Sequence, residues 1–120
     1  MCAKPASLLN RTPKCLPGDH RRRPKIEVRA EACEKAAGIF RALGDTARLQ
    51  MLAMLSEGDM CVTEIADRLG DNLSAVSQRL RLLRAERIVR QRREGKHVFY
   101  SFADRHVAEM ISNALAHAEE

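Results

Sequence analysis

The stretch from residue 63 to residue 102 most constrains the fold, because two short helical patterns, a tight turn and a basic alternating segment follow one another directly. Residues 64–70 read as a short helix that Thr63 caps and a glycine ends. After the turn DN, residues 73–88 form a second helical pattern. Its apolar positions at helical spacing are Leu73, Val76, Leu80, Leu83 and Ile88. Residues 89–102 then tend to alternate polar and apolar side chains around EGK, which predicts a β-hairpin.

Further helices are expected on both sides of this stretch. One pattern begins near Val28 and runs through AEACEKAAGIFRAL, and another, ARLQMLAMLSE, follows a cap at Asp45 or Thr46. MCV is a short β-like segment, and a terminal helix follows Asp104, which is a good N-cap. Aromatic residues are few and Trp is absent, which favours helices. The sequence therefore predicts a mainly α fold with a small β-hairpin (α+β), a winged helix-turn-helix.

The N-terminal residues differ in composition from the remainder of the chain. All four prolines and the run RRRPK fall among them, so residues 1–27 are expected to form a flexible basic arm and residues 28–120 the folded domain. No run approaches the ~20 apolar residues of a membrane span, and there is no apolar h-region. A cytoplasmic protein with no membrane partner is expected. Its cysteines are then reduced thiols: Cys2, Cys15, Cys33 and Cys61.

The net charge of +5 is unevenly placed. Residues 1–30 hold eight Lys or Arg against two acids, a local charge of +6. The ninety residues that follow sum to −1, yet residues 79–96 within them again hold eight cations against two acids. A concentrated basic stretch in a near-neutral body indicates a polyanionic partner. The alternative is a solvated helix face, but the density of cations favours nucleic acid.

In a winged helix-turn-helix, the second helix enters the major groove of double-stranded DNA. The exposed polar residues expected at the start of that helix are Ser74, Ser77, Gln78 and Arg81. Gln can read adenine, Arg can read guanine or hold the backbone, and Ser can reach bases or phosphate. On the hairpin, the cations expected against phosphate or the neighbouring minor groove are Arg92, Arg93 and Lys96. The simpler alternatives are that Ser74 only caps the helix and that Arg84 is solvated.

The C-terminal stretch DRHVAEMISNALAHAEE carries an acid beside each of two histidines. Eleven residues make about three helical turns, so His106 and His117 lie within roughly 20° of each other but ~16 Å apart along the axis. Zinc binds imidazole nitrogen at about 2.0–2.1 Å. One helix therefore cannot bring both histidines, with Asp104 and Glu120, to one ion. The apolar stripe beside them consists of Val107, Met110, Ile111, Ala114, Leu115 and Ala118.

Two copies of this helix can complete the arrangement. If they pair antiparallel about a two-fold axis through their apolar stripes, Asp104 and His106 of one copy meet His117 and Glu120 of the other. The result is two identical intersubunit sites per dimer, which suit Zn²⁺, with Co²⁺ or Cd²⁺ as alternative occupants. Four protein ligands leave no open position, so neither an enzyme nor a small-molecule substrate is expected. The alternative is a solvated helix with incidental polar residues.

These motifs together resemble the ArsR/SmtB family of bacterial metal-sensing repressors, from about Ala37 to the C-terminus, and most of all its zinc-responsive SmtB type. The resemblance is carried by FRALGDTARLQML, MCVTEIA, LSAVSQRLRLLRAERIV, REGKHVFYSF and the closing Asp-x-His…His-x-x-Glu. It implies a homodimer, joined through N- and C-terminal helices, that binds operator DNA without metal. Zn²⁺ at the four C-terminal ligands would release the operator and derepress genes for metal efflux or sequestration. Because a metal-bound histidine usually donates its other N–H, we expect His117 to contact backbone near Arg87.

The resemblance also implies a second metal site. Some members of the family bind metal through a cysteine at the start of the first DNA-binding helix, together with ligands from the arm. Cys61 and Glu64 match the helix position, and Cys15 and His20 are the candidates in the arm. Thr63 stands where arsenic sensors often carry a second cysteine, which argues against arsenite. The alternatives are that Cys61 is a small buried hydrophobe, or that the repressor senses thiol oxidation or a softer metal through Cys61 and the N-terminal cysteines.

Overall fold

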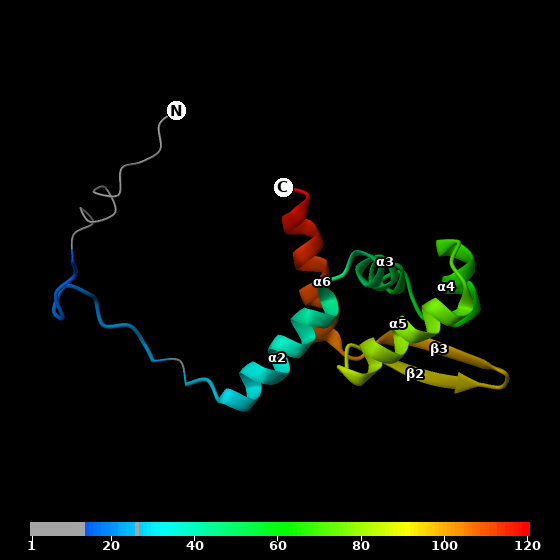
Figure 1. Ribbon diagram of the computed structural model, residues 1–120, viewed down its shortest axis with the longest axis horizontal. Coiled ribbons are helices and arrows are strands. Elements are labelled where there is room, and N and C mark those ends of the chain that lie inside the picture. Colours follow the sequence, from blue (N-terminus) through cyan, green and yellow to red (C-terminus); the bar gives the residue numbers. More distant parts are fainter. Residues whose placement is uncertain (1–13, 26) are drawn as a thin grey trace.

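The computed structural model of the protein describes residues 14–25 and 27–120. The rest of the predicted arm, residues 1–13 with Cys2 and residue 26, lies outside the described residues. Between residues 14 and 25 the structure contains a turn and no helix or strand. This segment runs away from the folded body (Figure 1). The flexibility of the arm and the division of the chain at residue 27 stay predictions.

Five helices and three strands form the body of the described chain. The helices are α2 (Ala30–Leu43), α3 (Thr46–Leu55), α4 (Val62–Leu69), α5 (Leu73–Ala85) and α6 (Arg105–Ala118). The strands are β1 (Met60–Cys61), β2 (Val89–Glu94) and β3 (His97–Phe102), which pair antiparallel in the order β1-β3-β2. α4 and α5 are the helices of the predicted helix-turn-helix, and β2 and β3 form the wing (Figure 1). The expected mainly α fold with a hairpin is confirmed.

Side-chain caps begin three of the helices. In each case a side-chain oxygen of the cap residue accepts a hydrogen bond from a backbone N–H three residues later. The pairs are Asp45 with the Arg48 N–H (3.0 Å), Asn72 with the Ala75 N–H (2.8 Å) and Asp104 with the Val107 N–H (3.0 Å). Gly70 ends α4 with a φ of 66°, a left-handed conformation that glycine adopts without a steric penalty. Because Asn72 caps α5, the alternative role of Ser74 as the cap is wrong, and its hydroxyl is exposed.

The predicted start of α4 is wrong by two residues. The helix begins at Val62 with Cys61 as its N-cap residue, and Thr63 lies within the first turn. Strand β1 is the reason, because Cys61 pairs with Phe99 of β3 and the chain turns directly from strand into helix. The Thr63 hydroxyl faces back toward Cys61 instead, with 3.1 Å between Oγ1 and Sγ.

The core lies between α3, α4, α5 and the base of the wing. The largest side chains that are fully buried there are Met51, Leu52, Ile65, Val76, Leu80, Leu83 and Ile88. Most of the apolar stripe predicted for residues 73–88 is therefore confirmed. Leu73 is the exception, because it is the first residue of α5 and remains 49 % exposed.

Helices α2 and α6 flank this core and bury only part of their apolar surface. α2 buries Gly38 and Ala42, whereas Phe40 on the same helix is 63 % exposed. α6 buries Val107 and Ile111 near its start, and every residue from 112 onward is exposed. The C-terminal part of α6 extends beyond the rest of the body (Figure 1). Among the described residues, no helix combines the length and the apolar character needed to cross a membrane.

Candidate metal centre and nucleic-acid interface

Helix α6 divides the four predicted metal ligands into two pairs, one at each end. Asp104 Oδ1 lies 3.8 Å from His106 Nδ1, and His117 Nδ1 lies 3.8 Å from Glu120 Oε2. All four side chains are exposed. In the part of the chain that the structure describes, no three His, Cys, Asp or Glu side chains gather closely enough to hold a metal ion. One chain therefore presents two separate half-sites.

The chemistry of each half-site fits a zinc-type ion. Each offers one imidazole and one carboxylate, the nitrogen and oxygen ligands that Zn²⁺ accepts. Asp104 also caps α6, but only Oδ1 is used for this, since it accepts from the Val107 N–H. Among the described residues no hydrogen bond engages Oδ2 of Asp104. The carboxylate can therefore begin the helix and still present an oxygen to an ion.

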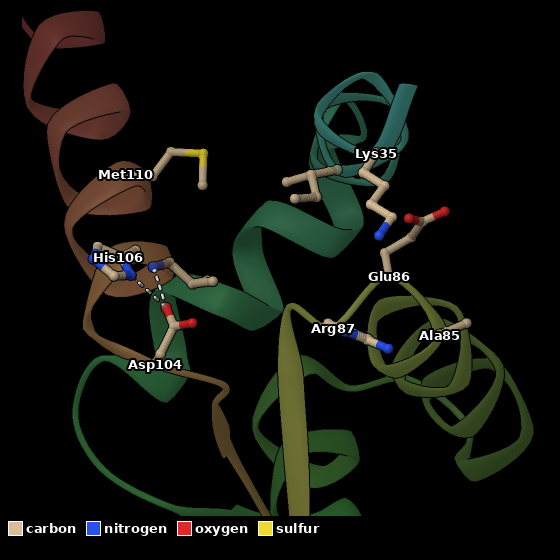
Figure 2. Close-up of a pocket in the computed structure, with 9 residues that line it drawn as sticks. Lys35, Ala85, Glu86, Arg87, Asp104, His106 and Met110 are labelled. Carbon is tan, nitrogen blue, oxygen red and sulfur yellow. Dashed lines mark hydrogen bonds and ion pairs between the residues drawn. The ribbon is translucent and has the colours of Figure 1, made fainter. Parts of the chain in front are cut away.

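The N-terminal half-site borders a cavity of about 420 Å³. Figure 2 shows Asp104, which caps α6, with His106 and Met110 of that helix on one side and Glu86 and Arg87, which follow α5, on another. The full lining consists of Lys35, Ile39, Ala85, Glu86, Arg87, Asp104, His106, Val107 and Met110. This half-site therefore lies against the end of the helix expected to read DNA.

The chain turns sharply at this end of α5. Arg87 has a φ of 58°, a left-handed conformation that costs a residue with a Cβ roughly 1–2 kcal/mol. Its N–H donates to the Arg84 carbonyl (3.0 Å), and the Ile88 N–H donates to the Leu83 carbonyl (2.9 Å). These two bonds form a Schellman motif with arginine where glycine is usual. His117 does not line the cavity, so the predicted contact of His117 with backbone near Arg87 would need a second copy of α6.

The structure does not bring the residues of the second predicted metal site together. Cys61 and Glu64 lie at the start of α4, whereas Cys15 and His20 belong to residues 14–25, the segment that runs away from the folded body (Figure 1). Cys61 is half-buried. Hydrogen bonds from the Thr63 side chain and from the Glu64 N–H lower the pKa of the Cys61 thiol. The Cys61 thiol is therefore more acidic than an ordinary cysteine. In the described part of the chain, however, it does not belong to a group of three or more possible metal ligands.

The predicted DNA-reading residues share the solvent-facing side of α5. They are Ser74, Ser77, Gln78 and Arg81, and all four are exposed. Their spacing of three, one and three residues puts them on one face of the helix. Asn72 holds the start of α5, so this face is anchored close to its N-terminus.

Ion pairs within the chain occupy some of the cations in the basic stretch. Arg79 Nη1 lies 2.6 Å from Asp71 Oδ2, and this bond lowers the pKa of Asp71. Arg92 bonds Asp59 over 3.0 Å and also contacts Glu94. Among the described residues, neither Arg93 nor Lys96 takes part in an ion pair, and both are exposed. The sequence analysis missed the pairing of Arg92, because Asp59 lies 33 residues earlier and no local pattern marks it.

Comparison of the chain with known proteins identifies its family. Residues 45–91 match the family described as "Bacterial regulatory protein, arsR family". The transcriptional repressor SmtB homolog of Synechocystis is 37 % identical over 90 residues, which span 75 % of this chain and 68 % of that protein. The chain belongs to the ArsR family.

Two further comparisons extend this assignment within the ArsR family. The cadmium resistance transcriptional regulatory protein CadC homolog of Staphylococcus aureus is 34 % identical over 82 % of each chain. The homodimeric winged helix-turn-helix DNA-binding domain Mb0332 of Mycobacterium bovis has a TM-score of 0.74 at 30 % identity and covers 82 % of this chain and 92 % of its own. The protein is therefore a DNA-binding transcriptional regulator, and the expectation that it is not an enzyme agrees with the kinds of protein it is related to.

Proposed function

We propose that the protein is a homodimeric, zinc-responsive repressor. Without metal it binds operator DNA, and it releases the operator when Zn²⁺ binds between the C-terminal helices, which derepresses genes for metal efflux or sequestration. The observation that carries this proposal is the division of Asp104, His106, His117 and Glu120 into two exposed half-sites at opposite ends of one helix. Its place of action is the cytoplasm, where bacterial DNA lies.

A second copy of the chain would supply what each half-site lacks. Antiparallel pairing of two α6 helices about a two-fold axis brings Asp104 and His106 of one copy to His117 and Glu120 of the other. The exposed apolar residues Phe40 of α2 and Leu115 of α6 belong to the helices that would form this interface. The homodimeric Mycobacterium bovis relative supports such an assembly.

The position of α6 suggests how the half-sites act on DNA binding. When bound, the ion would cross-link the two α6 helices and so restrict the angle between them. The start of α6 shares a cavity with Glu86 and Arg87 at the end of α5. A change in the angle of α6 is therefore transmitted to the separation of the two recognition helices. Operator half-sites lie about one helical turn apart, so a misplaced helix loses its contacts.

One observation favours a second candidate function, a repressor that responds to thiol oxidation or to a softer metal at Cys61. The lowered pKa of that thiol increases its share of thiolate, the form that reacts with oxidants and binds metal ions. The relative named for cadmium resistance supports a soft metal in this alternative. In this case the C-terminal histidines would not be needed for the response.

Operator binding with and without zinc separates the two candidates. DNA selected from a random library by the metal-free protein would be titrated, at fixed salt, with wild type and with the His106→Ala/His117→Ala variant. We expect zinc to weaken binding by wild type and to leave the variant on DNA. If zinc releases both proteins equally, sensing does not lie in α6, and Cys61 becomes the leading candidate.

A further inference from the structure

Arg92, on strand β2 of the wing, is held from three directions. Its guanidinium bonds Asp59 Oδ2 over 3.0 Å. It also contacts the Glu94 carboxylate, and its central carbon lies 5.1 Å from the centroid of the Phe99 ring. Arginine suits such a position, since its planar group can bond two carboxylates and stack on a ring at the same time.

The bond to Asp59 spans the sheet. In the order β1-β3-β2, strands β1 and β2 are not neighbours. Phe99 of β3 stands opposite both Cys61 of β1 and Arg92 of β2, so these three side chains form a row on one face. Asp59 lies just before β1. The Arg92 side chain thus crosses Phe99 and fastens the outer strand of the wing to the segment that leads into the helix-turn-helix.

A second link holds the base of the wing. In the amide orientation that satisfies both of its ends, Gln91 donates to the Tyr100 hydroxyl over 3.0 Å and accepts from the Arg84 guanidinium over 2.9 Å. Arg84 belongs to α5, so this link joins the recognition helix to the wing. The direction of the wing is therefore set at two points, at α5 by Gln91 and at the start of β1 by Arg92.

Arg93 offers a direct contrast. It is the next residue on the same strand and points to the other face, because side chains alternate along a strand. It is exposed, and no ion pair within the described chain engages it. A cation in this position can neutralise a phosphate and release a counterion. The charge of Arg92 is already balanced by Asp59 and Glu94.

We infer that Arg92 is a positioning residue for DNA binding, which fixes the direction of the wing through Asp59, rather than a residue that contacts phosphate. The inference revises the role predicted for Arg92 from its position in the basic hairpin, and it rests on the DNA-binding function. Arg93 and Lys96 then supply the charge that the wing presents to DNA.

The salt dependence of DNA binding tests this inference. The dissociation constant for the selected operator would be measured by fluorescence anisotropy at several salt concentrations, for wild type, Arg92→Ala, Arg92→Lys, Asp59→Asn and the control Arg93→Ala. Loss of one phosphate contact reduces the slope of log K against log salt by about 0.9, hence by about 1.8 for the two copies in a dimer. We expect this reduction for Arg93→Ala. For Arg92→Ala we expect an unchanged slope, because the loosened wing still makes the same phosphate contacts when bound and loses affinity only through the cost of ordering it.

Asp59→Asn gives the sharpest contrast. If Arg92 positions the wing, losing its carboxylate partner should weaken binding about three- to tenfold, as Arg92→Ala does, and the double variant should be no weaker than either. Arg92→Lys keeps the charge but lacks the planar group that bonds Asp59 and stacks on Phe99 at the same time, so it should also weaken binding. If Arg92 contacts phosphate, Asp59→Asn should tighten binding, Arg92→Lys should retain it, and Arg92→Ala should lower the slope.

Measurements without DNA keep the inference separate from the proposed function. In ¹H–¹⁵N spectra of the free protein, Arg92→Ala and Asp59→Asn should shift the same amides of β2 and β3, whereas Arg93→Ala should shift only its neighbours. Separate patterns for the first two variants would overturn the inference. Failure of wild type to bind DNA in a salt-dependent way would instead refute the proposed function.

Discussion

The DNA-reading unit and the pair of flanking helices differ in how much of their structure one chain supplies. In the DNA-reading unit, α4, α5 and the wing enclose a buried core, and ion pairs such as Arg79–Asp71 hold the surface. α2 and α6 instead leave Phe40 and Leu115 exposed and keep the candidate ligands apart. The first unit is therefore packed mainly within one chain, whereas the second leaves apolar residues and candidate ligands on the surface.

This difference assigns separate tasks to the two regions. Under the proposed function, the DNA-reading unit would keep its shape when metal binds, and regulation would act on the distance between the two units of a dimer. The end of α5 is the point where the regions meet, since Glu86 and Arg87 share a cavity with Asp104 and His106 (Figure 2). Variants that affect one region and spare the other test this division.

The largest effect is expected from mixing two inactive variants. Asp104→Ala/His106→Ala and His117→Ala/Glu120→Ala each lack one half-site, so neither homodimer should bind zinc tightly. A mixed dimer has one complete site, and random re-pairing after unfolding and refolding together should restore about one quarter of the wild-type sites. Zinc titration of the mixture measures this.

Two outcomes would contradict a shared site. Tight zinc binding by either variant alone would place the site within one chain, and a mixture with no restored sites would show that the half-sites do not meet. Wild type unfolded and refolded in the same way is the control.

A leucine-to-alanine substitution should affect the stability of the monomer in one region and the stability of the dimer in the other. Leu80 is fully buried in α5, so Leu80→Ala should lower the free energy of unfolding by about 2–5 kcal/mol. Leu115 is 38 % exposed on α6, so Leu115→Ala should change the stability of the monomer by less than about 0.5 kcal/mol but weaken dimerisation about tenfold or more. Urea unfolding and sedimentation velocity would measure the two effects, and a Leu115→Ala dimer as tight as wild type would exclude α6 from the interface.

A smaller effect of about 1 kcal/mol is expected where the two regions meet. Arg87→Gly should raise the free energy of unfolding, because glycine adopts a φ of 58° without strain, although its freer unfolded chain offsets part of the gain. The reverse change, Gly70→Ala at a φ of 66°, should lower stability by a similar amount. Thermal unfolding of both variants and of wild type would measure the two changes in stability. Equal destabilisation by both would show that the Arg87 side chain contributes more than its backbone costs.

The smallest effect concerns the thiol of Cys61. Its lowered pKa means that the thiolate is present at lower pH than for an ordinary cysteine. Thr63→Val removes the largest cause of the lowering, so the midpoint of alkylation against pH should move upward and the rate at neutral pH should fall a few-fold. Iodoacetamide kinetics on chelator-treated protein measure this. An unchanged midpoint would assign the lowered pKa to the helix backbone alone.

The sequence predicted those parts of the fold that local patterns determine. Helical spacing, the glycine at position 70 and the turn around EGK located the helix-turn-helix and the wing correctly. The start of α4 was predicted wrongly, because the pairing of Cys61 with Phe99 depends on a strand 38 residues later in the chain. The bond between Arg92 and Asp59 was missed for the same reason.

The candidate site was predictable to a similar extent. The eleven-residue spacing of the histidines separates the ligands on one helix, as the structure also shows. The cavity that joins Asp104 to Arg87 was not expected, since it depends on how α6 packs beside the end of α5. Closure of the site between two copies stays a prediction.

The cap at Asp104 has a consequence for the order in which a site would assemble. Its carboxylate is fixed by the Val107 N–H as soon as α6 forms, so its rotational freedom is lost before any ion arrives. Glu120 stands beyond the last residue of the helix and keeps its freedom. In the proposed shared site, the N-terminal pair would thus act as a template and the C-terminal pair as the adjustable partner. Discrimination between ions of different size should then depend chiefly on how closely His117 and Glu120 can approach.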